Sequence, residues 1–169
     1  MNILGINCGL HDASACLVVD GKIIAFSAEE RHSRKKHDGR YPANAIKNCI
    51  DWANLTYSDI DAVAYSWDYF KYETEKLIFH IRKTLEMAQN GPDKAIDYLS
   101  NMLKRKEKLY DKFNEAENET GKLFDCEFVK VDHHLAHVYS AFPLSGFPHS
   151  ALLIVDGSGE MMCLSLIHI

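Results

Sequence analysis

The Asp20-Gly21 dipeptide is the feature of this 169-residue sequence that most constrains its fold. It separates two apolar runs, residues 13–19 and 23–26. An Asp-Gly pair in that position is the strongest short-range signal for a β-hairpin, because both central residues of a type I′ turn need positive φ. A third apolar run, residues 3–8, comes just before them. We therefore predict three consecutive strands, of which the second and third are antiparallel neighbours.

The rest of the chain alternates between helical and strand-like periodicity. The predicted elements are a helix from Pro42, a strand at residues 60–66, a mostly helical segment at 67–120 that breaks at 90–92, a strand at 126–131, a helix at 133–142 and a buried strand at 150–155. Charges of both signs are interleaved through the helical segment, which is typical of a solvated helix face. The order predicts an α/β protein with one lobe of an actin and sugar-kinase-like (ASKHA) fold, a helical insertion at about 67–120, and the first strand of a second lobe.

The composition narrows the classes of function. Twenty-four acidic against nineteen basic residues give a net charge of −5, which disfavours a nucleic-acid partner. No apolar run approaches the roughly 18 to 20 residues of a membrane-spanning helix, and the N-terminus carries no export signal. Five scattered cysteines without a CxxC pair indicate reduced thiols. We expect a soluble, cytoplasmic protein with no membrane partner.

The densest chemical signal is the histidine-rich segment DHHLAH at residues 132–137. On a helix, His133 and His137 project from one face and suit a single metal ion, with Asp132 or His134 supporting them. Imidazole favours iron or zinc, and the pair alone does not choose between them. A third ligand, a carboxylate, has to come from elsewhere in the chain. The alternative interpretation is a polar helix start with solvated histidines.

The loop GLHDAS at residues 9–14 is the second signal. It can direct backbone N–H groups and the imidazole of His11 toward a phosphate or a hydroxyl, with Asp12 beside it. Histidine is the natural general base near neutral pH. The alternative is an ordinary hairpin loop in which Asp12 hydrogen-bonds its own backbone.

A basic segment at residues 31–40 is the third signal, with five Lys and Arg residues on an acidic chain. Arg34, Lys35 and Lys36 lie at its centre and are candidate ligands for a carboxylate or phosphate group. The alternative is a solvated loop, as charge runs usually are.

The glycine-rich turn after residues 150–155 is the fourth signal. Asp156, Gly157 and Gly159 lie in this turn, where small residues let the backbone approach a ligand closely, and they are further candidates for substrate binding. The alternative is a simple turn.

Together these segments resemble the N-terminal domain of the carbamoyltransferases of antibiotic and nodulation-factor biosynthesis. The resemblance rests on ILGINCGLHDASACLVVDGKIIAFSAEERHSRKKHDGRYPANAI, then VDHHLAHVYSAF, then ALLIVDGSGE, in that order and spacing. It covers residues 1–160, which we take as one incomplete domain.

The resemblance implies an enzyme that transfers a carbamoyl group to a hydroxyl of a small-molecule acceptor. Carbamoyl phosphate and ATP would be the co-substrates, and a carbamoyl-adenylate the intermediate. It further implies that His133 and His137 bind iron(II) or another divalent metal, that Asp156 lies beside the metal or substrate, and that His11 is the base at the acceptor hydroxyl. A cation that polarises the carbamoyl carbonyl is best placed near that base.

The end of the sequence departs from the family pattern. That pattern continues past Glu160 with the rest of the second lobe, a distal aspartate at the metal and a C-terminal domain that forms the carbamoyl-adenylate. We therefore predict a truncated fragment that is inactive alone. Residues 163–169 resemble translated sequencing-adapter sequence and are predicted to be a non-native tail.

Two other functions stay open at this point. The related tRNA threonylcarbamoyl-transfer enzymes share the lobe and the histidine pair, although the net charge and the HDASA and RKKHD segments argue against them. A non-catalytic metal-binding or interaction module that uses residues 67–120 belongs to a different class. Retained metal without carbamoyl transfer would favour it.

Overall fold

A mixed five-stranded sheet forms the centre of the computed structural model, which describes residues 1–157 and 162–169. Its strands are β1 (Asn2–Asn7), β2 (Ser14–Val19), β3 (Lys22–Ala28), β4 (Ala62–Tyr65) and β5 (Glu127–Lys130). They lie in the order β3-β2-β1-β4-β5. β1 pairs antiparallel with β2 and β2 with β3, whereas β1 with β4 and β4 with β5 are parallel. The predicted α/β class is confirmed.

The hairpin between β2 and β3 has the predicted geometry. Asp20 and Gly21 have φ values of 48° and 76°, so both central residues of the turn are left-handed. Val19 pairs with Lys22 across it. The two-residue turn therefore fixes the register of this edge of the sheet.

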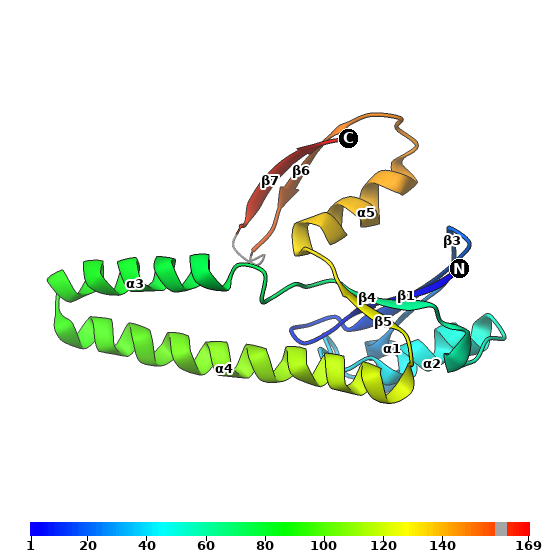
Figure 1. The fold of residues 1–169 in the computed structure, drawn as a ribbon, viewed down its shortest axis with the longest axis horizontal. Coiled ribbons are helices and arrows are strands. Elements are labelled where there is room, and N and C mark those ends of the chain that lie inside the picture. The colour runs from blue at the N-terminus through cyan, green and yellow to red at the C-terminus, as the bar shows by residue number, and fades with distance from the viewer. Residues whose placement is uncertain (158–161) are drawn as a thin grey trace.

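Helices cover both faces of the sheet (Figure 1). They are α1 (Glu29–Ser33), α2 (Ala43–Trp52), α3 (Glu73–Gln89), α4 (Pro92–Leu123) and α5 (His133–Ser145), with a short 3-10 helix, η1 (Tyr57–Asp59). α2 and the end of α4 lie on one face, and α5 lies over the other. The predicted helix break is confirmed at Gly91, and α3 and α4 form a hairpin that projects from the sheet. α1 was not predicted, and its last residues, 31–33, begin the basic segment for which a solvated loop was the alternative interpretation.

The core joins the sheet to α2 and α4. Leu4, Leu17, Val63 and Ile46 are fully buried in it, and Phe113 of α4 is 4% exposed. The interleaved charges of α4 therefore occupy only part of its surface. The C-terminal half of α4, which contains Phe113, is therefore part of the domain core.

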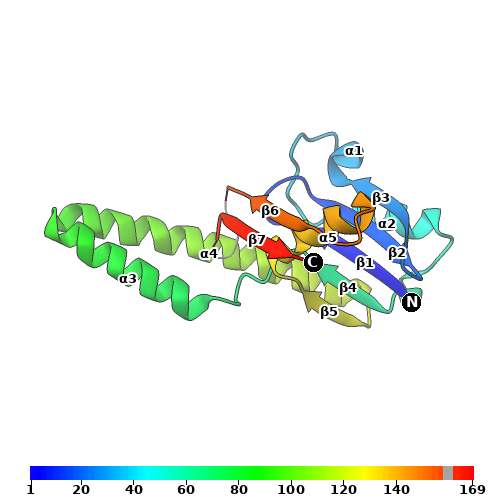
Figure 2. The same ribbon diagram turned by 90° about the horizontal axis from the view of Figure 1, so that it is seen from above.

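A second, two-stranded antiparallel sheet lies beyond α5 (Figure 2). It consists of β6 (Ala151–Val155), which is the predicted strand at 150–155, and β7 (Leu164–His168). β6 does not pair with the five-stranded sheet. β7 comes from the residues predicted as a non-native tail, and their origin stays a prediction.

The structure can be compared with two expectations from composition, namely reduced thiols and the lack of a membrane-spanning helix. All five cysteines are free thiols, as predicted. None of the helices formed by the described residues is long and apolar enough to cross a membrane.

Candidate metal centre and active site

Two histidines and one carboxylate converge where α5 begins and β6 ends. Nε2 of His133 lies 2.8 Å from Oδ2 of Asp156 and 3.2 Å from Nε2 of His137. The third distance, from Nε2 of His137 to Oδ2 of Asp156, is 3.7 Å. The predicted histidine pair does share one helix face, and Asp156 supplies the carboxylate that the sequence left unassigned.

The spacing of these donor atoms fits a single divalent ion. Metal–ligand bonds of about 2.0 to 2.1 Å in tetrahedral geometry place neighbouring donors about 3.4 Å apart. The observed distances lie on both sides of that value. Two imidazoles and one carboxylate with open positions are the donor set of non-haem iron(II) sites and of catalytic zinc sites.

The surroundings of His133 fix its orientation. Its Nδ1 lies 3.3 Å from the carbonyl oxygen of Ser66, at the end of β4. A carbonyl can only accept, so Nδ1 carries a proton, and Nε2 is the nitrogen that would offer a lone pair to a bound ion. The indole of Trp67 stacks on the imidazole, with ring centroids 3.9 Å apart and planes at 21°. We predicted that Asp132 or His134 would orient the histidine pair. In the structure, Ser66 and Trp67 orient His133 instead.

Asp132 and His134 have structural roles. Asp132 is the N-cap of α5, where its Oδ1 accepts the N–H of Leu135 at 3.2 Å, and its Oδ2 pairs with Lys71 at 3.0 Å. Burial raises the pKa of Asp132, but these two partners outweigh it and leave the pKa lowered. Nδ1 of His134 lies 2.6 Å from the hydroxyl of Ser165 on β7.

Asp156 is ionised and aimed at the histidines. Burial raises the pKa of Asp156, but its neighbours lower that pKa by more. They are the N–H of Gly157, which donates to Oδ1 at 2.7 Å, and the imidazoles of His133 and His137. Oδ2 is thereby left to face the imidazoles. We predicted Asp156 and Gly157 as substrate-binding residues; in the structure Asp156 is one of the three candidate metal ligands, and Gly157 follows it. Gly159 lies outside the described residues.

The loop between β1 and β2 holds a second cluster around Asp12. The carboxylate of Asp12 bridges Nδ1 of His11, at 2.7 Å, and Nδ1 of His37, at 2.9 Å. These two hydrogen bonds, the one with His37 first, lower the pKa of Asp12. With Nδ1 engaged by a carboxylate, Nε2 of the exposed His11 is the nitrogen available to take a proton.

The segment after α1 holds this loop in place. Gly9 donates its N–H to the carbonyl of Gly39, and Ala13 donates to that of Asp38, both at 2.7 Å. A Cβ at Gly39 would lie 2.4 Å from the carbonyl oxygen of Leu10, so only glycine allows this approach. Asp38 is fully buried and pairs with Arg40 at 2.6 Å.

Asn7, at the end of β1, connects the two clusters. Its Nδ2 donates to the carbonyl oxygens of Asp12, at 3.2 Å, and His11, at 3.4 Å. Its Oδ1 accepts the hydroxyl of Ser66 at 2.8 Å. Because the carbonyl of Ser66 orients His133, one short chain of hydrogen bonds links the predicted base to the metal ligands.

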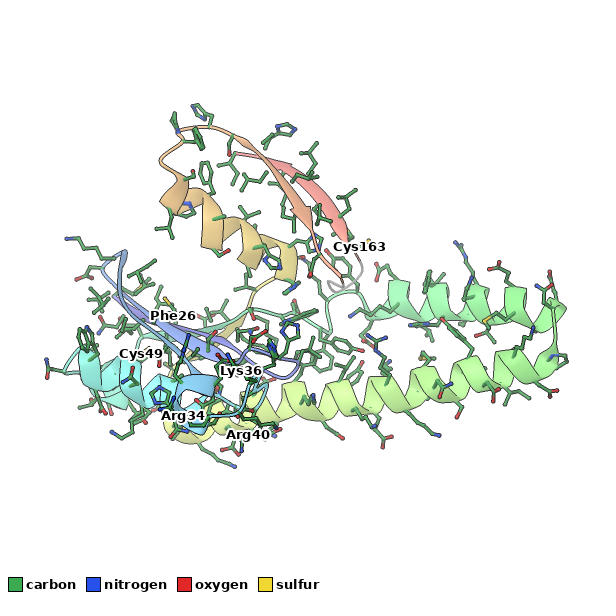
Figure 3. All side chains as sticks on the ribbon, turned by 180° about the vertical axis from the view of Figure 1, so that it is seen from behind. Phe26, Arg34, Lys36, Arg40, Cys49 and Cys163 are labelled. Atoms are coloured by element: carbon green, nitrogen blue, oxygen red, sulfur yellow. The ribbon has the colours of Figure 1, made fainter. Side chains whose placement is uncertain are left out.

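The three basic candidates lie at the surface. Arg34, Lys35 and Lys36 are exposed, and Lys36 pairs with Glu30 at 3.3 Å. Figure 3 shows Arg34 and Lys36 on the segment that follows α1, apart from Cys163 near the start of α3. No contact among the described residues assigns them to a ligand, so their binding role stays a prediction.

Sequence reasoning missed four supporting residues. Asn7, His37, Gly39 and Trp67 each act on a predicted site residue through a contact that is distant in sequence. His37 carried a signal, since its HD dipeptide repeats the one at residues 11–12. The others carried none.

The domain has a mixed β-sheet with helices on both faces. At one end it brings together two histidines, one carboxylate and a histidine-bearing loop, which makes it a candidate metal-dependent enzyme domain. Comparison with known proteins identifies the family of the chain. The family model described as Carbamoyltransferase N-terminus matches residues 2–168. The chain belongs to that family, which confirms the resemblance seen in the sequence.

The similar proteins are mostly longer. Nodulation protein NolNO of Sinorhizobium fredii is 34% identical over 155 residues, which cover 91% of this chain and 20% of that protein. An uncharacterized protein of Synechocystis sp. is 34% identical over 173 residues, covering 98% of this chain and 27% of that protein. The chain thus spans less than a third of the length of either relative. Among solved structures, YeaZ from Pseudomonas aeruginosa matches with a TM-score of 0.44 and 14% identity, over 99% of this chain and 66% of that chain.

Proposed function

We propose that this chain is the acceptor-modifying, N-terminal part of an O-carbamoyltransferase. The reaction moves a carbamoyl group from carbamoyl-adenylate, formed from carbamoyl phosphate and ATP, to a hydroxyl of a small-molecule acceptor. The observation that carries the proposal is the link, through Asn7 and Ser66, between a metal-ligand cluster and a carboxylate-held histidine in a chain of the carbamoyltransferase family.

The residues of the two clusters divide the work. His133, His137 and Asp156 would hold a divalent ion, iron(II) or another, which would supply Lewis-acid polarisation of the carbamoyl carbonyl. Nε2 of His11 takes the proton of the acceptor hydroxyl as its oxygen bonds to the carbamoyl carbon. The bond from that carbon to the phosphate oxygen breaks, and AMP leaves. Asp12 holds the imidazole and stabilises its protonated form.

The proposed reaction also requires a source of carbamoyl-adenylate. We propose that the five-stranded sheet is one lobe of an ASKHA-type fold, that β6 begins the second lobe, and that a C-terminal domain makes the adenylate. Arg34 and Lys35 remain candidates for the phosphate of that adenylate, because they are exposed and close in sequence to His37.

The test uses the full reading frame that contains this sequence. The encoded protein is supplied with ATP and radiolabelled carbamoyl phosphate, and label is followed into a panel of hydroxyl compounds, alongside measurement of bound iron and zinc. His133→Ala should abolish transfer and lower bound metal. His149→Ala, at an exposed loop histidine, is the matched control and should leave both unchanged.

Two results would contradict the proposal. Transfer that survives His133→Ala at full rate would remove the metal cluster from the reaction. A protein that keeps its metal but transfers no label to small molecules would instead favour a binding module, and label recovered in tRNA would favour a threonylcarbamoyl-type enzyme.

A further inference from the structure

An exposed apolar stripe runs along α3, the first helix of the projecting hairpin. Its main residues, Ile78, Ile81 and Leu85, are 45%, 49% and 61% exposed. Because they are spaced three and four residues apart, they lie on one side of the helix. A row of large apolar side chains in contact with water is typical of a surface that another molecule covers.

A different side of α3 packs against α4. There, Glu73 pairs with Lys106 at 2.8 Å, and Nδ1 of His80 lies 2.8 Å from the hydroxyl of Tyr98. The hairpin also extends well beyond the five-stranded sheet in both views (Figures 1 and 2). The apolar stripe is therefore open to a partner without any rearrangement of the hairpin.

The stripe has the spacing of a coiled-coil seam. Thr74, Ile78, Ile81, Leu85 and Ala88 alternate in steps of four and three residues, as the a and d positions of a heptad repeat do. A second copy of α3 has the same spacing. With a two-fold axis near the middle of the helix, Ile78 of each copy meets Ile81 of the other, and Thr74 meets Leu85. The seam is thus complementary to itself in an antiparallel pair.

The charges beside the stripe favour the same pairing. Glu75 and Arg82 are exposed and seven residues apart, so they lie along one edge of the stripe. They cannot pair within one helix, where ion pairs join residues three or four apart. In the antiparallel pair, Glu75 of each copy lies beside Arg82 of the other, displaced by about 3 Å along the axis. The opposite edge carries Leu77 and Thr84, which add no charge.

We propose that α3 is a self-association surface, through which two copies of this chain form an antiparallel helix pair. The 17 residues of α3 give a contact about 25 Å long and about 10 Å wide. This is smaller than the roughly 800 Å² per partner of stable complexes. The dimer is therefore weak, with a dissociation constant above about 1 µM. This inference goes beyond the proposed carbamoyl transfer and involves neither metal nor substrate.

Sedimentation velocity of the 169-residue chain tests the pairing, in low-salt buffer and from about 5 to about 500 µM. The sedimentation coefficient should rise with concentration. Glu75→Lys sets bases beside bases and Arg82→Glu sets acids beside acids, so each variant alone should associate about tenfold more weakly or less. An equal mixture of the two variants should regain the original association, because every contact at this edge then joins a base to an acid.

Two exposed leucines give a matched control for the apolar contact. Leu85 lies on the stripe, whereas Leu144 lies near the end of α5 and is 71% exposed. Leu85→Asp should weaken association at least about tenfold, and Leu144→Asp should leave it unchanged. Neither substitution removes core packing, so both variants should keep the helix content and the melting temperature of the original chain.

Three results would overturn the inference. The first is a chain that stays monomeric up to about 500 µM. The second is a mixture of the two charge variants that associates no better than either alone. The third is equal association of the Leu85→Asp and Leu144→Asp variants, which would assign the contact to another surface. None of these measurements follows carbamoyl transfer, so their failure leaves the proposed function standing.

Discussion

Phe113→Ala tests whether the helical insertion is part of the domain core. Phe113 is 4% exposed and contacts three rings, with centroid distances of 4.9 Å to Tyr69, 5.8 Å to Tyr65 and 6.1 Å to Trp67. Truncating a buried Phe costs about 3 to 5 kcal/mol. A domain of this size loses about 2 to 4 °C in Tm for each kcal/mol, so the expected drop is about 6 to 20 °C.

The assay is thermal denaturation followed by circular dichroism, with Phe147→Ala as the control. Phe147 is 65% exposed in the loop after α5, so its removal should cost less than about 0.5 kcal/mol and shift Tm by less than about 2 °C. If Phe113→Ala melts as the control does, the insertion does not stabilise the sheet. The reasoning that makes α4 part of the domain core would then be refuted.

Three further predictions concern the site. Gly39→Ala should push the Leu10 carbonyl away by up to about 1 Å and lower carbamoyl transfer of the full-length enzyme about 100-fold, whereas Gly121→Ala, whose added Cβ meets nothing within 4 Å, should leave the rate unchanged. Hydrogen bonds from its arginine partner hold the pKa of Asp38 below the ordinary 3.8, so stability from this pair is present above about pH 4 and is lost as the pH falls below it. Melting curves from pH 7 to about pH 2.5 should show that acid-dependent component, and Asp38→Asn should remove it. Added iron(II) or zinc should raise the Tm, chelator should reverse this, and Asp156→Asn should abolish the rise, as calorimetry can check.

Most of the fold was predictable because local signals specify it. The Asp20-Gly21 turn sets one hairpin, and the change of period after Pro42 marks α2. Two features were not predictable. α1 has a charged sequence with no apolar stripe, and β7, which pairs with the predicted strand β6, is formed by residues predicted as a non-native tail. Both are placed by tertiary contacts, which no short window of sequence contains.

The candidate site also contains residues that were predictable from local sequence and residues that were not. His133 and His137 were predictable because their spacing on one helix is a local property. The local pattern placed Asp156 in a glycine-rich turn, and only the family resemblance placed it beside the metal or substrate. Its approach to the histidines depends on how β6 leaves the second sheet. The roles of Asn7 and Gly39 arise from contacts across the fold. A sequence can therefore show which residues are able to react, while the fold decides which of them meet.

The candidate metal ligands come from two separate parts of the fold. His133 and His137 belong to α5, which lies over the main sheet, whereas Asp156 directly follows β6. Several large side chains of the smaller sheet are exposed, with Leu153 at 65% and Val155 at 73%, so apolar burial alone does little to fix it. The carboxylate–imidazole contacts at the end of β6 are thus a principal tie between the two sheets. We therefore expect metal affinity at this candidate site to be coupled to the placement of β6, because the same three side chains would set both.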